Sequence, residues 1–351
     1  MRRLLPTRFL RHRGLALAAA ALAVLGGCGG GAKTSPSGPG ASRPGNDAGR
    51  TSTTGPPSLR ATLTPWTLPA AVSRPVVLNL GGQLDILGGL ATGDVSTDAI
   101  VSMNPTSGTT NPGGKLEEGV HDAAGAVLNG TAMVFGGGSY TDVATVQGWT
   151  PGTPTAVVVG NLPVARSDLA AVEAGATAYV LGGFDGTAMV GSILATKDGV
   201  HFKVVGELSQ PVRYAGVTLD GSGDIWVIGG ELGTSGNADA GGATSEIQRF
   251  DPATGMTSVV AHLPTTLGHD QALFLGGRIY VTGGRTAAGP SAAIWEIDPT
   301  TGTVVADGSL PGPRSDAGAV VIGGVGYLVG GEVSGPTAPL DTVVQLKLER
   351  Q

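Results

Sequence analysis

Short apolar runs that end in a glycine pair recur six times along this chain. The runs are Ile86–Gly89, Val134–Gly137, Val180–Gly183, Val227–Gly230, Val281–Gly284 and Leu328–Gly331, and their first glycines lie 46 to 54 residues apart. A repeat of this length is typical of β-units arranged radially, in which each unit buries its faces against its neighbours. The pattern therefore predicts an all-β architecture of six units.

Residues 162–208 show the organisation of one unit. Apolar and β-branched residues separated by turn residues predict four short strands, at Ala170–Val172, Ala178–Leu181, Ser192–Ala195 and His201–Val205. Four strands in about 47 residues match the size of a propeller blade.

Turn residues recur at matching places in the other units. Two-residue hairpins need positive φ angles, which glycine and asparagine adopt readily. Such pairs are Gly81-Gly82, Asn129-Gly130, Ser222-Gly223, Gly276-Gly277 and Gly323-Gly324. A later hairpin is marked by proline turns at Asn104-Pro105, Asp251-Pro252 and Asp298-Pro299.

With these motifs in phase, residues 58–351 resemble a kelch-repeat β-propeller. The resemblance rests on the glycine pairs, the proline turns and two further sets. An aromatic residue stands three positions before four of the pairs (Tyr179, Trp226, Tyr280, Tyr327), and an arginine stands sixteen before three of them (Arg166, Arg213, Arg314). Asp85 and Met133 replace the aromatic residue in the first two units. The resemblance implies an all-β, six-bladed kelch-type β-propeller.

The sixth unit has room for only three strands before the chain ends. Arg60–Thr67 precedes Leu68-Pro69 in the way that Thr155–Val159 and Ser258–Ala261 precede their own Leu-Pro pairs. We therefore expect the N-terminal segment to supply the outer strand of the last blade. Closing the ring in this way removes two free sheet edges.

The first 28 residues differ from the rest. Five arginines precede the apolar run Leu15–Leu25, which is too short to span a membrane, and Leu25-Gly26-Gly27-Cys28 follows. This segment resembles a bacterial lipoprotein signal, which implies cleavage before Cys28 and lipid attachment to it. The alternative is an ordinary secretory signal with an incidental cysteine. Since Cys28 is the only cysteine, the chain has no internal disulfide.

Three segments are expected: a lipoprotein signal peptide (1–28), a disordered Gly/Ser/Pro-rich tether (29–57) and the propeller (58–351). The protein would then be anchored by lipid to the cell membrane on the extracytoplasmic side. Loss of residues 1–28 leaves 16 Lys plus Arg against 27 Asp plus Glu. That charge disfavours nucleic acid and anionic lipid surfaces as partners, so the membrane is expected to be contacted through the lipid alone. We expect a monomer.

In kelch propellers the strand after the Leu-Pro step is innermost, and its first residues surround one end of the central channel. Counting back from each glycine pair transfers these channel positions to this chain and gives two rings of residues. Fifteen positions back are Ser73, His121, Ser167, Tyr214, Gly268 and Ser315; fourteen back are Arg74, Asp122, Asp168, Ala215, His269 and Asp316, with Asp270 beside His269.

Polar and ionisable side chains therefore recur at one channel mouth, where converging loops make a natural binding site. The expected ligand-binding residues are His121, Asp122, Asp168, Arg213, Tyr214, His269, Asp270, Arg314 and Asp316. Alternatively, Arg166, Arg213 and Arg314 pair with Asp168 and Asp316, or with backbone carbonyls, and lock adjacent blades.

Loops after the glycine pairs are expected to share this mouth. They contribute Tyr140, Asp142, Phe184, Asp185, Glu231, Arg285 and Glu332. The fourth unit carries an insertion, Glu231–Ser245, rich in Gly, Ser and Asn. It is either a mobile loop that covers the site or a plain surface insertion.

Most enzyme signatures are missing from the sequence. We find no phosphate-binding glycine loop and no Gly-x-Ser-x-Gly motif. Asp220–Asp224 is faintly similar to a calcium loop but lacks the later glutamate. Copper-containing kelch oxidases need a cysteine joined to a tyrosine, and Cys28 belongs to the signal. We predict no metal and no cofactor.

Two functions from different classes remain. The first is a non-enzymatic module that binds a protein or a glycan of the cell envelope at the channel mouth. The second is a carbohydrate-active enzyme, such as a sugar epimerase or mutarotase, since six-bladed kelch mutarotases exist. His121 or His269 would then be the catalytic acid or base.

Overall fold

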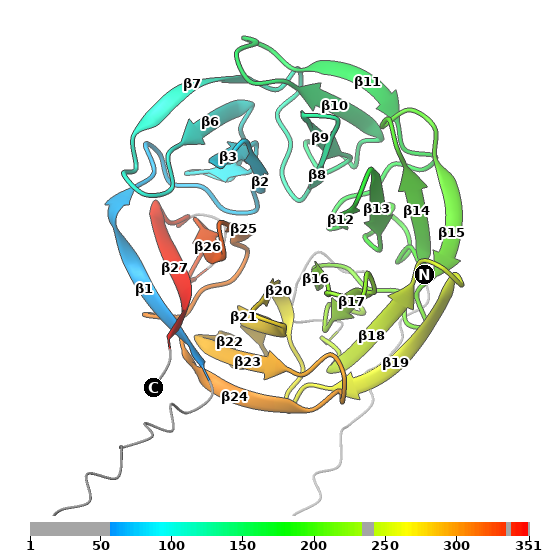
Figure 1. Ribbon diagram of the computed structural model, residues 1–351. Helices are drawn as coiled ribbons and strands as arrows, with labels where there is room; N and C mark the ends of the chain where they lie inside the picture. Colours follow the sequence, from blue (N-terminus) through cyan, green and yellow to red (C-terminus); the bar gives the residue numbers. More distant parts are fainter. Residues whose placement is uncertain (1–56, 234–241, 335–337, 350–351) are drawn as a thin grey trace, which may run out of the picture. The chain divides into compact units, whose positions relative to one another are not determined.

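Each apolar run before a glycine pair forms the second strand of a small antiparallel sheet, and six such sheets stand in a ring (Figure 1). The computed structural model describes residues 57–233, 242–334 and 338–349, all within one compact unit, Thr53–Gln351. The predicted signal peptide with Cys28, the tether up to residue 56 and residues 234–241 of the insertion lie outside the described residues.

The strands of the blades, from the channel outward, are as follows. Blade 1 has β2 (Val76–Leu80), β3 (Gln83–Leu87), β6 (Ala99–Met103) and β7 (Thr110–Lys115), beside a hairpin of β4 (Leu90–Ala91) and β5 (Val95–Ser96). Blade 2 has β8 (Ala124–Leu128), β9 (Thr131–Phe135), β10 (Thr145–Trp149) and β11 (Val157–Asn161). Blade 3 has β12 (Ala170–Ala174), β13 (Thr177–Leu181), β14 (Ser192–Thr196) and β15 (Lys203–Glu207). Blade 4 has β16 (Gly216–Leu219), β17 (Ile225–Ile228), β18 (Glu246–Asp251) and β19 (Met256–His262). Blade 5 has β20 (Gly268–Leu275), β21 (Arg278–Thr286), β23 (Ala293–Ile297) and β24 (Val304–Ser309), with β22 (Gly289–Pro290) pairing β21. Blade 6 has β25 (Gly318–Ile322), β26 (Val325–Val329), β27 (Thr342–Glu349) and, outermost, β1 (Ser58–Thr67).

The N-terminal strand closes the ring, as the sequence predicts. β1 pairs antiparallel with β27, in a register that runs from Ser58 opposite Glu349 to Thr67 opposite Thr342 (Figure 1). Blade 6 is thereby built from both ends of the described chain. The six-bladed, all-β architecture is confirmed. Among the described residues, the structure has no helix of the length and apolarity that crossing a membrane takes.

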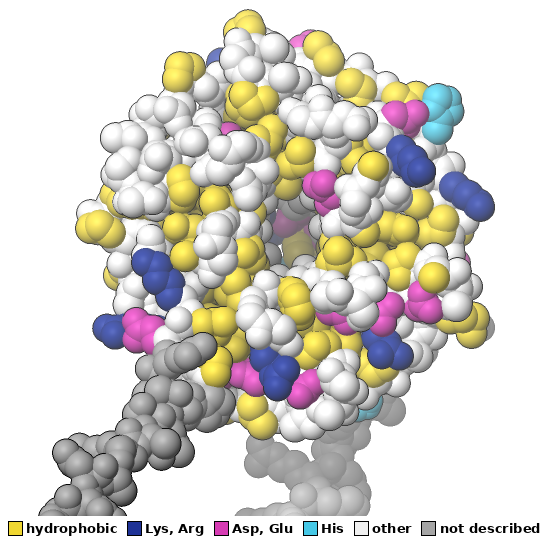
Figure 2. Space-filling view, in the orientation of Figure 1, with side chains coloured by type: hydrophobic (Ala, Val, Ile, Leu, Met, Phe, Trp, Pro, Cys, Tyr) yellow, Lys and Arg dark blue, Asp and Glu magenta, His cyan; other side chains and the backbone are white. Residues whose placement is uncertain are grey.

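The hydrophobic core is divided among the six interfaces between neighbouring blades. One cluster packs Leu78 and Leu87 of blade 1 against Val134 and Trp149 of blade 2, and five further clusters repeat this around the ring. Each second strand is covered on both faces by adjacent blades, so its apolar residues are continuous rather than alternating. Because the apolar surface is used between blades, the centre of the ring remains a channel, visible as a hollow in Figure 2.

The glycine pairs hold neighbouring blades together. In blade 3, Gly182 has φ +64°, and a Cβ on it would lie 2.6 Å from the carbonyl oxygen of Val212 in blade 4. Gly183 donates its N–H to that same oxygen at 3.0 Å. The other five pairs make the same contact with the blade that follows. Positive φ and this close approach together require glycine.

Two local expectations are wrong by two or three residues. The outer strand of blade 3 begins at Lys203 rather than His201, because the Asp198 carboxylate accepts the N–H groups of Val200 and His201 and holds them in a turn. In blade 4, Leu219 pairs with Ile225, so the first hairpin has a five-residue loop rather than a two-residue turn at Ser222-Gly223.

Candidate functional site

Six residues, one per blade, form a ring at one end of the channel. All have left-handed backbone conformations, with φ between 52° and 59°, which is uncommon for residues other than glycine. The ring residues are Arg74, Asp122, Asp168, Tyr214, His269 and Asp316. This conformation lets their backbones bond from blade to blade: Tyr214 donates its N–H to Asp168, His269 to Tyr214 and Asp316 to His269, at 2.7 to 3.2 Å.

The ring corrects the sequence count in blade 4. Counting back from the glycine pair placed Ala215 in this ring and Tyr214 in its neighbour. The longer hairpin of blade 4 shifts the count by one, so Tyr214 is the ring residue. Arg213 is then the counterpart of Ser167 and Ser315, since all three pair with the loop after their own glycine pair.

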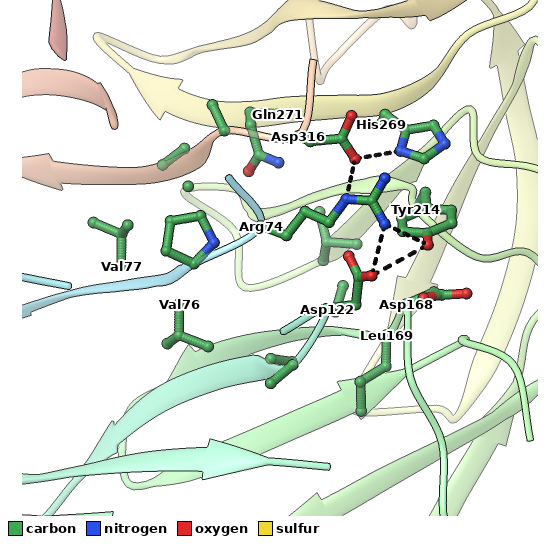
Figure 3. A pocket seen from close by; sticks show the side chains of 18 of the residues that line it. Arg74, Val76, Val77, Asp122, Asp168, Leu169, Tyr214, His269, Gln271 and Asp316 are labelled. Atoms are coloured by element: carbon green, nitrogen blue, oxygen red, sulfur yellow. Dashed lines mark hydrogen bonds and ion pairs between the residues drawn. The ribbon is translucent and has the colours of Figure 1, made fainter. Parts of the chain in front are cut away.

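Arg74 reaches across the channel and connects four blades. Its Nη1 donates to Asp122 Oδ2 at 2.9 Å and to the Tyr214 hydroxyl at 3.3 Å, and its Nε lies 3.4 Å from Asp316 Oδ1 (Figure 3). Its Nη2 donates to Glu332 at 3.4 Å. Burial acts to lower the Arg74 pKa, but the nearby carboxylates raise it by more than burial lowers it. The guanidinium therefore stays charged. Sequence reasoning placed Arg74 in the ring but missed it as a contact residue.

His269 is held on both ring nitrogens and is buried. Its Nδ1 lies 2.5 Å from Asp316 and its Nε2 3.0 Å from Glu231, while its ring stacks on Tyr214 with centroids 3.9 Å apart. Burial acts to lower the His269 pKa, but the charge and hydrogen bond of Asp316 and those of Glu231 raise it to about 9. His269 is therefore an imidazolium that is hydrogen-bonded through both nitrogens, and it connects blades 4, 5 and 6.

Two further carboxyl groups at the ring have near-neutral pKa values. Burial and the nearby charge of Asp122 raise the Asp168 pKa to about 7, although Arg213 opposes the shift. Burial and Asp316 raise the Glu332 pKa to about 7. By contrast, burial of Asp316 is outweighed by His269 and Arg74, which hold its pKa below the usual range. The ring thus holds protonatable carboxyls beside permanent charges.

A hollow of about 470 Å³ opens above the ring over blades 2, 3 and 4. We call it the mouth. Its wall includes His121, Tyr140, Asp142, Phe184 and Arg213, and its floor includes ring residues. Tyr140 is fully exposed. The predicted loop residues Tyr140, Asp142 and Phe184 therefore do share one mouth with His121.

His121 faces this mouth, unlike His269. Its side chain is about 20% exposed, its Nδ1 is hydrogen-bonded to the Ser96 hydroxyl at 2.8 Å, and its Nε2 lies 3.7 Å from Asp122 Oδ2. Gly138 leaves room for this ring, since a Cβ there would lie 3.2 Å from Nε2. The two candidate catalytic histidines thus have different surroundings: one lines the mouth and the other is enclosed.

A second cavity of about 180 Å³ lies along the channel on the other side of Arg74. Beyond the ring residues its wall is mostly small apolar side chains from the innermost strands, including Val76, Ala124, Ala170 and Ala319, and Asp270 and Gln271 add polar groups to it. Arg74, Asp122, Asp168 and Tyr214 border both spaces. They separate the mouth from the channel below it.

Two of the predicted ligand-binding residues, Arg314 and Asp270, contact the fold rather than the mouth, and so does Arg166. Arg314 does not line the mouth; it is buried and donates to the backbone oxygens of Gly330 and Thr342 in its own blade. Arg166 does the same in blade 3. Asp270 lies against Gly216 of blade 4, where a Cβ would be 2.3 Å from its Oδ2. Of the three arginines sixteen positions before a glycine pair (Arg166, Arg213 and Arg314), Arg213 is the one that pairs with a ring carboxylate in the described structure, Asp168 at 3.3 Å.

The remaining loop residues act on the opposite side of the ring or in local turns. Glu231 pairs with Arg213 and His269, and Glu332 accepts from Arg285 at 3.2 Å. Asp185 closes its own turn on Thr187 and Ala188. These ion pairs connect blades 4, 5 and 6 at this end of the channel. The mouth lies over blades 2, 3 and 4.

The described residues contain no group of three His, Cys, Asp or Glu side chains arranged to hold a metal ion. At the calcium-like sequence, the Asp220 carboxylate accepts three backbone N–H groups of its own turn and the indole N–H of Trp226 at 2.8 Å. This carboxylate therefore serves the hairpin of blade 4.

No protein-family model matches the chain, and no curated protein matches its sequence. Among solved structures, the one described as "Structure of YjhT" is similar, with a TM-score of 0.67 and 16% identity over 81% of this chain and 99% of that one. At this identity the likeness shows the fold alone. The fold and the neighbour together define the class of protein: a six-bladed β-propeller.

Proposed function

We propose that the propeller is a binding module that takes a glycan in the mouth over blades 2, 3 and 4. The observation that supports this most is the mouth itself: a hollow of about 470 Å³, with an exposed tyrosine on its wall and ion-paired side chains on its floor. Small-ligand sites typically have about 300–1,000 Å³. Guanidinium and carboxylate groups offer donors and acceptors to hydroxyls, and aromatic faces suit the apolar side of a sugar ring.

A protein partner, the other ligand considered, fits this feature less well. Stable protein interfaces bury about 800 Å² on each partner and are centred on apolar anchors. The mouth is a hollow lined largely by polar side chains, with few apolar anchors. The end of a glycan chain can enter such a hollow and contact its polar wall, whereas a protein surface would contact mainly its rim.

The test is calorimetric titration of the protein with a panel of neutral and charged oligosaccharides. Replacing Tyr140 with Ala should weaken binding at least five-fold, because it removes the exposed ring at the mouth. Val305→Ala is the matched control, since it removes an exposed apolar side chain from outer strand β24. Equal loss in both variants, or binding of no saccharide, would contradict the proposal.

A second function, a carbohydrate-active enzyme such as an epimerase or mutarotase, is favoured by one observation. Asp168, whose pKa is raised to about 7 by burial and by Asp122, lines the same mouth as His121. Groups with near-neutral pKa values transfer protons efficiently at neutral pH. Turnover of a sugar anomer that disappears in Asp168→Asn and His121→Asn, with binding retained, would establish this function. We favour His121 over His269 as its acid or base, because both nitrogens of His269 are hydrogen-bonded to carboxylates.

The kelch assignment and the lipid anchor belong to the same proposal. The glycine pairs and the buried arginines of blades 3 and 6 support the kelch assignment, because they occupy repeated structural positions. The sequence Leu25-Gly26-Gly27-Cys28 supports lipidation at Cys28 and placement on the extracytoplasmic side of the cell membrane. Cys28→Ser should release the protein from membranes, and its retention there would contradict lipidation.

A further inference from the structure

Among the described residues, some charged side chains at the mouth are ion-paired and one is not. Arg74 is paired with Asp122, Asp316 and Glu332, and Arg213 is paired with Asp168 and Glu231. Both guanidinium groups are mostly buried in these pairs. An anionic ligand would have to compete with buried carboxylates for them, which is costly. The cations of the mouth are therefore poorly placed to receive an anion.

Asp142 differs from these paired arginines. Among the described residues its carboxylate forms no ion pair, although it lines the mouth. It stands in the connection between β9 and β10, where its backbone pairs with Gly138. Gly186 of blade 3 leaves room for it, since a Cβ on that glycine would lie 3.2 Å from Asp142 Oδ2. The mouth thus has one carboxylate more than its arginines neutralise.

Aromatic rings accompany this carboxylate. Tyr140 is two residues away and fully exposed, and Phe184 lines the mouth from blade 3. The Phe184 ring is already occupied by a cation, because the guanidinium carbon of Arg213 lies 5.5 Å from its centroid, so Tyr140 is the aromatic ring that remains for a ligand. An exposed aromatic ring and a carboxylate without an ion pair in the same hollow make an environment that favours an ammonium group.

The floor of the mouth limits how a ligand enters. Arg74 and its partners Asp122 and Tyr214 separate the mouth from the channel. A chain can therefore enter the mouth by its end but cannot thread through the ring while these bonds persist. This geometry suits the terminal units of an oligosaccharide.

We propose that the mouth binds the ends of saccharides that carry free amino groups, and that Asp142 receives an ammonium of the terminal units. The inference rests on the proposed glycan-binding function and names its ligand class. Amino sugars present both an apolar ring face for the aromatic side chains and a cation for Asp142. The acidic balance of the chain adds a weak long-range attraction for such ligands.

The experiment is calorimetric titration of the full chain, purified in detergent, with three trisaccharides of matched linkage. These are the trimers of glucosamine, of N-acetylglucosamine and of glucose. We expect the glucosamine trimer to bind at least ten-fold more tightly than the other two. We expect the preference to shrink as salt is raised, because salt screens charge. An N-terminally acetylated lysine amide serves as a cation without a sugar ring.

Two variants assign the preference to a residue. Asp142→Asn keeps the size of the side chain and should reduce the preference for the glucosamine trimer over the glucose trimer about ten-fold, because the ammonium group loses its countercharge. Glu349→Gln also removes one negative charge, from the exposed end of β27, and should leave the preference intact.

The outcomes separate this inference from the proposed function. Equal affinity for the three trimers overturns the amino-sugar assignment and leaves glycan binding standing. Binding of none of them overturns both. Lysine amide binding as tightly as the glucosamine trimer, or a preference unchanged by Asp142→Asn, also overturns the assignment.

Discussion

A single side chain, Arg74, connects several blades of this molecule. One guanidinium serves acceptors from blades 2, 4 and 6, and those partners are 48 to 258 residues away in sequence. Counting along the repeat could place Arg74 at the channel, because position follows from the repeat. It could not find the partners, because these lie across the ring and depend on how the blades are turned toward one another.

His121 and His269 give the same lesson in another form. The sequence count put them in neighbouring rings and made them equal candidates for acid or base. The count places Asp316 in the ring but does not show which side chains each histidine contacts: Ser96 for His121, and Glu231 and Asp316 for His269. Side-chain accessibility therefore had to come from the structure.

Asp270 gives a prediction for stability against pH. Burial without a paired cation raises its pKa to about 7, from an ordinary value of 3.8. The folded protein then keeps this proton over a range where the unfolded chain has lost it. The stability it contributes is complete below about pH 4 and is lost as pH rises through 7. Asp270→Asn should be more stable than the parent protein at pH 8, by about 2 kcal/mol, but not at pH 4.

Chemical denaturation at both pH values measures this difference. Glu117→Gln, at an exposed position, is the control and should change stability little at either pH. A stability difference between Asp270→Asn and the parent that is the same at pH 4 and pH 8 would show that the buried carboxyl is not the titrating group.

At the scale of the element, the sequence was most informative where glycine is required. Five first hairpins were located by their glycines. Five of the six glycine pairs directly follow second strands, and the sixth, Gly283-Gly284, lies within β21. The error in blade 4 has a simple cause: three extra loop residues and shorter strands shift the count by one. Spacing alone cannot distinguish a longer loop from a longer strand.

A comparison of two glycines tests the contact between blades. Gly182 and Gly175 have similar φ angles, +64° and +62°, but a Cβ meets the Val212 oxygen at 2.6 Å only at Gly182. Gly175→Ala should cost about 1 kcal/mol for its backbone conformation. Gly182→Ala should cost about 3 kcal/mol, because the next blade must also move. Equal losses in urea denaturation would argue against the close approach.

At the scale of the whole molecule, the ring depends on its two ends meeting. The strand β1 was predicted from its place before Leu68-Pro69, and its pairing with β27 completes blade 6. What the repeat could not predict is asymmetry. Six similar units produce a mouth over blades 2, 3 and 4 and a set of ion pairs that joins blades 4, 5 and 6, because the ring side chains differ.

That asymmetry is the central claim, and hydrogen–deuterium exchange tests it most directly. Exchange of the full chain is compared with and without the most tightly bound saccharide. We predict that the ligand slows exchange in residues 138–142 and 184–190, which border the mouth, and leaves residues 285–290 of blade 5 unchanged. Slowed exchange at 285–290 with none at 138–142 would contradict the claim.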